Sequence, residues 1–67
     1  MKMKYWVKER DNPQTGIYYV AEGQMTAKSA KLKEKTIYGN NIMLSFDTLS
    51  AYQSFLEELK KQGAKIL

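Results

Sequence analysis

The clearest pattern of apolar and polar positions lies in the second half of the chain, where residues 47–63 read DTLSAYQSFLEELKKQG. Asp47 or Thr48 can accept the free N–H groups of a first helical turn, and Gly63 can adopt the left-handed conformation that ends a helix. Apolar residues recur between them at spacings of three and four, which is the period of one helix face, at Leu49, Tyr52, Leu56 and Leu59. The pattern predicts the main helix over 47–63.

Two stretches in the first third of the chain alternate apolar and polar residues, as β-strands do. They are MKYWVKE at 3–9 and IYYVAEG at 17–23, and the turn-forming segment DNPQTG lies between them. These features predict a β-hairpin. Pairing Arg10 with Ile17 would place Tyr5, Val7, Tyr18 and Val20 on the core face, and Trp6, Lys8, Arg10 and Tyr19 on the other. A slip of one residue in the register would exchange these faces.

The remaining segments complete a small α+β domain. Thr26 can cap a weaker helix from Ala27 to about Lys35, after which residues 36–41 form either a loop or a tight hairpin turn. An apolar strand is predicted at 42–46 and a short strand at 64–67. The expected order is ββαβαβ in a single domain over 1–67, with the main helix packed on one face of a three- or four-stranded sheet.

The composition argues against an enzyme and against bound metals or cofactors. The chain has 67 residues with no cysteine and no histidine, which excludes disulfides, the usual structural zinc sites and imidazole acid–base chemistry. The four glycines are isolated, so neither glycine-rich phosphate loop is present. No apolar run approaches the roughly 20 residues that cross a bilayer, and no signal-peptide pattern follows the basic N-terminus. We expect a cytoplasmic protein without a membrane partner.

Charge is distributed unevenly along the chain. The net charge is +4, and residues 1–35 hold eight Lys and Arg residues against four acids, whereas residues 36–67 hold three of each. The first half therefore suits a polyanion or an acidic protein surface. A solvated basic face without a partner is the alternative.

Alternation places basic and aromatic side chains together on one face of the predicted hairpin. Lysine and arginine neutralise phosphates, and a flat ring offers a surface on which an unpaired base stacks for roughly 1–3 kcal/mol. The candidate nucleic-acid-binding residues on this face are Lys4, Trp6, Lys8, Arg10 and Tyr19. A lysine row on the weaker helix adds Lys28, Lys31 and Lys35, with Lys33 nearby. The alternative is that Trp6 and Tyr19 pack in the core while the lysines reach out to solvent.

Two segments resemble a known family of DNA-binding domains. The hairpin VKERDNPQTGIYYV and the later SFDTLSAYQSFLEEL are similar to the strands and following helix of the small three-stranded domains at the N-termini of some tyrosine recombinases. The resemblance covers about half of the chain, and Gly23–Asn41 is inserted relative to it. It implies that the sheet enters the major groove and that strand side chains contact bases.

The sequence thus leads to two functional hypotheses. The first is a small non-catalytic nucleic-acid-binding protein, for DNA or RNA, that contacts phosphates through the basic strand face and the lysine row. The second is a protein-binding inhibitor or accessory module that acts on a larger nucleic-acid-handling protein. Its tyrosine, tryptophan and methionine residues suit interfaces, and exposed strand edges would also permit a homodimer.

Overall fold

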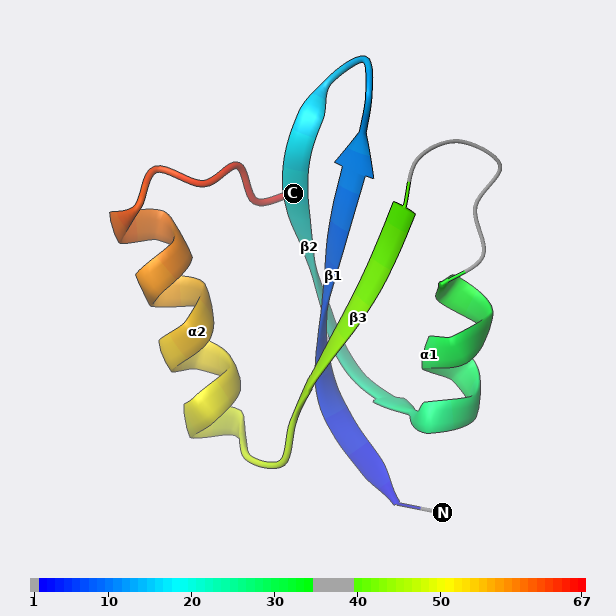
Figure 1. The fold of residues 1–67 in the computed structure, drawn as a ribbon. Coiled ribbons are helices and arrows are strands. Elements are labelled where there is room, and N and C mark those ends of the chain that lie inside the picture. The colour runs from blue at the N-terminus through cyan, green and yellow to red at the C-terminus, as the bar shows by residue number, and fades with distance from the viewer. Residues whose placement is uncertain (1, 35–39) are drawn as a thin grey trace.

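The computed structural model describes residues 2–34 and 40–67, with Asn40 described for its backbone alone. Its α+β class agrees with the prediction (Figure 1). The elements are β1 (Met3–Asn12), β2 (Gly16–Thr26), α1 (Ala27–Lys33), β3 (Asn40–Phe46) and α2 (Leu49–Lys61).

The three strands form one antiparallel sheet in the order β2-β1-β3, so β1 is central. Both neighbours run opposite to β1 and therefore parallel to each other. Helix α1 connects β2 to β3 across one face of the sheet, and α2 covers the other face (Figure 1). Below, the two faces are called the α1 side and the α2 side.

Both helices begin at a threonine, as the sequence predicts. The Oγ1 atom of Thr26 accepts the N–H of Ser29 at 3.2 Å, and that of Thr48 accepts the N–H of Ala51 at 3.1 Å. Thr48 rather than Asp47 is therefore the cap of α2, and its helix is shorter at each end than the predicted 47–63. Gly63 follows with a φ of 77°, the left-handed conformation that stops the helix.

The predicted hairpin forms, but its predicted register is wrong by one residue. Ile17 pairs with Asp11, and Arg10 pairs with Tyr18. The reason is a shorter loop, because Asn12 already pairs with Gly16, whose φ of 83° suits a three-residue hairpin connection. The Asn12 side chain also accepts the backbone N–H of Gln14 at 2.8 Å within this turn. The slip exchanges the faces of β2 relative to β1.

A β-bulge interrupts the pairing of β1 with β2. Trp6 lies opposite Gly23 and Val7 lies opposite Ala21, so Glu22 is an extra residue on β2. Gly23 has a φ of 78°, which a residue with a Cβ adopts only with strain. The bulge changes which residues face each side of the sheet farther along β2.

Each side of the sheet has its own small core. On the α2 side, Val7 is fully buried beneath a group of rings in which Tyr5 lies 5.5 Å from Tyr52 and Phe46 lies 5.1 Å from Phe55. On the α1 side, the buried side chains are Met25 and Ala30. Leu32 of α1 is 64% exposed. Helix α1 is therefore held by few apolar contacts.

The chain ends beside the outer edge of β2. Tyr19 donates its backbone N–H to the Lys65 carbonyl at 2.8 Å, and its carbonyl accepts the N–H of Leu67 at 2.7 Å. This makes a single parallel bridge between Tyr19 and Ile66. The strand predicted at 64–67 is thus reduced to one bridge, and the described sheet has three strands instead of the full ββαβαβ order.

Candidate nucleic-acid interface

Strand β1 directs its even-numbered side chains to the α1 side, as alternation predicts. Lys8 reaches Glu22, Arg10 reaches Asn41, and Trp6 reaches the start of α1. Lys4 is also an even-numbered residue of β1. Its Nζ lies 3.5 Å from a carboxylate oxygen of Asp47, in the connection from β3 to α2. The four predicted β1 residues are therefore aligned along one strand face.

Trp6 is tied into the fold. Its ring is half-buried, and its Nε1–H donates to the Met25 carbonyl at 2.9 Å, just before the cap of α1. Met25 itself is buried. The indole therefore holds the end of β2 in place, which agrees with the packing alternative for this residue.

Tyr19 does not lie with the other candidate residues. It pairs with Glu9 on β1 and faces the α2 side, where its ring meets Phe55 edge-on at 6.4 Å. Its hydroxyl donates to Glu9 Oε1 at 2.9 Å, and this bond, burial and the negative charge of Glu9 raise its pKa above the ordinary 10.0. Tyr18, which pairs with Arg10, lies instead on the face where Tyr19 was predicted. The sequence signal that was missed is Gly16, which shortens the loop.

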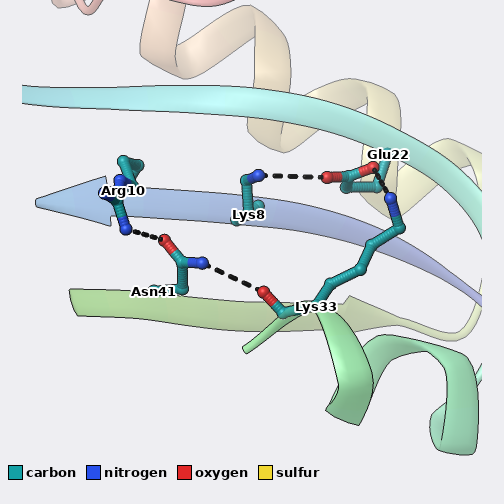
Figure 2. Close-up of polar contacts among 5 residues, drawn as sticks. All are labelled: Lys8, Arg10, Glu22, Lys33 and Asn41. Atoms are coloured by element: carbon teal, nitrogen blue, oxygen red, sulfur yellow. Dashed lines mark hydrogen bonds and ion pairs between the residues drawn. The ribbon is translucent and has the colours of Figure 1, made fainter. Parts of the chain in front are cut away.

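The extra residue of the bulge supplies an acid to the basic face. The Glu22 side chain, 11% exposed, places one oxygen 3.7 Å from Lys8 Nζ and the other 3.4 Å from Lys33 Nζ (Figure 2). One carboxylate therefore joins β1, β2 and α1 and leaves one of the two positive charges uncompensated. Sequence reasoning missed Glu22, because regular alternation does not reveal a bulge.

A second polar chain fixes the far end of α1 to β3. Arg10 Nη1 donates to Asn41 Oδ1 at 3.1 Å, and Asn41 Nδ2 donates to the Lys33 carbonyl at 3.0 Å (Figure 2). Asn41 thus satisfies a carbonyl in the last turn of α1. A shallow hollow of about 330 Å³ lies beside the guanidinium, lined by Arg10, Asn12, Pro13 and Gln14.

The lysine row of α1 lies on the outer surface of the helix. Lys28 and Lys31 are exposed, and Ala30 between them is buried against the sheet. Lys33 is 49% exposed at its side chain and belongs to the Glu22 pair. Lys35, the third residue of the predicted row, lies outside the described residues.

The fold sorts charge between its two sides. Within the described residues, the α1 side carries Glu22 and Glu34, and Asp47 reaches it from the connection between β3 and α2 to bond Lys4. Its basic residues are Lys4, Lys8, Arg10, Lys28, Lys31 and Lys33. The α2 side carries more acid than base, with Glu9, Asp11, Glu57 and Glu58 against Lys60 and Lys61. The positive potential is therefore concentrated on the α1 side.

The described parts of the chain hold no group of three His, Cys, Asp or Glu side chains that could bind a metal ion. No helix among them has the length and apolar character needed to span a membrane. Comparison with protein-family models, curated proteins and solved structures found no match for this chain.

Proposed function

We propose that this protein is a non-catalytic nucleic-acid-binding protein whose α1 side contacts the phosphate backbone. The observation that carries the proposal is the gathering of six basic side chains from β1 and α1 on the α1 side, with three acids, Glu22, Glu34 and Asp47, among them. Such a surface attracts a polyanion such as the phosphate backbone, and salt limits the range of this attraction to about the Debye length.

The exposed lysines of α1 are the principal contacts in this proposal. In the described part of the chain, Lys28 and Lys31 have no acid within ion-pair distance, so a phosphate does not need to displace an existing partner. Lys8 and Lys33 share Glu22 and together offer about one positive charge. The Lys4–Asp47 pair is exposed and therefore weak, because exposed pairs contribute roughly 0–1 kcal/mol, so Lys4 remains available to a phosphate.

The arrangement favours contact with phosphates over insertion of the sheet into a groove. Helix α1 packs on the sheet face that carries the basic β1 residues, and the Trp6 hydrogen bond holds the chain just before this helix, so this face is not an open sheet surface. Tyr18, half-buried opposite Arg10, is the ring of this face that we assign to base stacking. We therefore expect binding with little sequence preference.

The test is binding of labelled mixed-sequence duplex DNA, single-stranded DNA and RNA, measured by fluorescence anisotropy at several salt concentrations. Affinity should fall with salt, with a log–log slope of roughly −0.9 per neutralised phosphate on duplex DNA. The double variant Lys28→Gln/Lys31→Gln should weaken binding several-fold and make the slope shallower by about 0.9 for each lost contact.

The matched control is Lys60→Gln/Lys61→Gln, which removes the same charge from the exposed end of α2. This variant should bind nearly as well as the wild type. Equal losses in both double variants would show that net charge, and not the α1 side, determines affinity. Absence of binding at low salt would remove the nucleic-acid proposal altogether.

A further inference from the structure

The two edges of the sheet differ in how they are protected. The outer edge of β2 is bonded by the tail at Tyr19. Strand β2 also contains the bulge at Glu22 and Gly23, and Glu22 is charged. Tail coverage, bulges and charges are the devices by which natural proteins block pairing with another strand. The outer edge of β3 has no strand beside it among the described residues.

In the part of the chain that the structure describes, strand β3 shows none of these devices. Its sequence is NNIMLSF, which contains no charged residue and no proline. Its pairing with β1 runs without a register shift from Asn40 to Phe46, so its outer edge is straight as well as neutral. Ile42 is 49% exposed on the α2 side of this edge. An uncharged seven-residue edge with an exposed isoleucine is suited to accept another strand.

We propose that β3 pairs antiparallel with β3 of a second copy of this chain, with the two Met43 residues opposite each other. The strand is self-complementary in this register. Ile42 lies opposite Leu44 of the second copy on the α2 side, and Asn41 lies opposite Ser45 of the second copy on the α1 side. In the centre of the strand, apolar residues thus meet apolar residues and Asn41 meets Ser45, and the one mixed pair is Asn40 with Phe46 at the ends. A shift by two positions would instead place Met43 opposite Ser45 in the centre.

The dimer would be a continuous six-stranded sheet. Because side chains that face each other across paired strands lie on the same face, the α1 sides of both copies would lie on one side of this sheet. The proposal does not depend on the proposed function, since it rests on β3 alone. If both hold, dimerisation doubles the basic surface that a single nucleic acid can contact.

The first test compares two substitutions by sedimentation velocity over a range of protein concentrations. Ile42→Lys places an ammonium group opposite Glu9 in the monomer, which tolerates it, but opposite Leu44 of the second copy in the dimer. Its control is Ile17→Lys, because Ile17 is 57% exposed and pairs with Asp11 on the other edge. We expect a concentration-dependent dimer for the wild type and Ile17→Lys, and a monomer for Ile42→Lys.

The second test determines the register, because the chain contains no cysteine of its own. Cα atoms of directly opposed antiparallel residues lie about 4.5–5.5 Å apart, within the range of roughly 4.4–6.8 Å that a disulfide spans. Met43→Cys should therefore form a disulfide-linked dimer under mild oxidation. In the control Ser45→Cys, the two cysteines would lie four residues apart along the sheet, about 14 Å, and should not link.

Two results would overturn the proposal. One is a wild-type chain that stays monomeric at all concentrations, in which case the β3 edge is left to a strand of another protein. The other is cross-linking of Met43→Cys no faster than that of Ser45→Cys. Circular dichroism of each variant establishes that it is folded before either result is counted.

Discussion

Tyr19 links more parts of the molecule than its half-buried position suggests. Its ring packs against Phe55 of α2, its hydroxyl bonds Glu9 of β1, and its backbone bonds the tail on both sides. The hydroxyl is therefore held in its neutral, proton-donating form by the fold. This gives Tyr19 a titration that reports on the folded state.

The stability that this hydrogen bond supplies should disappear at high pH. The pKa of Tyr19 is raised above 10.0, mainly because its hydroxyl donates to Glu9. A raised pKa means that the folded state favours the protonated form, so the contribution is complete below about pH 10 and is lost as pH rises through the folded pKa. The difference in unfolding free energy between the wild type and Tyr19→Phe, from urea denaturation, should therefore shrink as the pH rises above about 10.

pH-dependent contributions that are common to both proteins cancel in this difference. Glu9→Gln is the companion variant. It should bring the pKa of Tyr19, followed by ultraviolet absorbance, back toward its ordinary value. A difference that stays constant with pH would show that the hydroxyl does not bond Glu9 in solution.

At the scale of elements, local signals predicted what depends on neighbouring residues and missed what depends on loop length. Thr26, Thr48 and Gly63 act as helix boundaries because capping is decided within one turn. The hairpin register was not recoverable in the same way, because alternation has a period of two and fits either face equally well. The length of the turn before Gly16 decided it.

The tail is a short element whose removal has a measurable cost. Ending the chain after Lys65 removes the Leu67 hydrogen bond to Tyr19 and the half-buried Ile66. A hydrogen bond contributes about 0.5–1.5 kcal/mol and partial burial of an isoleucine a similar amount, so we expect a loss of about 1–3 kcal/mol in urea denaturation. The control is Leu67→Ala, since that side chain is 64% exposed and its backbone bond remains. Equal stability of the two variants would contradict this role of the tail.

The molecule as a whole is a flat plate, with extents of 36 × 29 × 12 Å over its Cα atoms. Its two cores lie on opposite sides of one sheet and are unequal. On the α2 side several rings contact one another, whereas on the α1 side the half-buried Trp6 lies near the buried Met25 and Ala30. Strand β1 belongs to both cores and is paired on both edges. The free energy of local opening should therefore differ between elements, and it should be higher in β1 than in α1.

Amide hydrogen exchange, followed residue by residue by NMR, checks this gradation. Protection should be highest in β1, around Val7, which opens only when the whole domain unfolds. It should be markedly lower in α1, around Ala30, because this short helix can detach while the sheet and α2 persist. Equal protection in the two elements would show that α1 is part of a single cooperative unit.

The candidate site was predicted in part, for reasons that belong to the whole fold. Lys4, Lys8 and Arg10 share a face because alternation along one strand is local. Their meeting with α1 depends on Glu22 and Asn41, which come from two other strands and are brought together only by the crossover of α1. Long-range juxtapositions of this kind have no signature in a single sequence.

The bulge at Glu22 has a practical consequence for redesign of this protein. Before it, odd-numbered residues such as Tyr19 point to the α2 side; after it, odd-numbered residues such as Met25 point to the α1 side. A protein engineer who extrapolates a simple odd–even rule along β2 would choose Gln24 as packing beneath α1 and assign Met25 to the α2 side. That choice would strip the smaller core of a buried side chain, so mutational libraries for this strand should restart their numbering at Gly23.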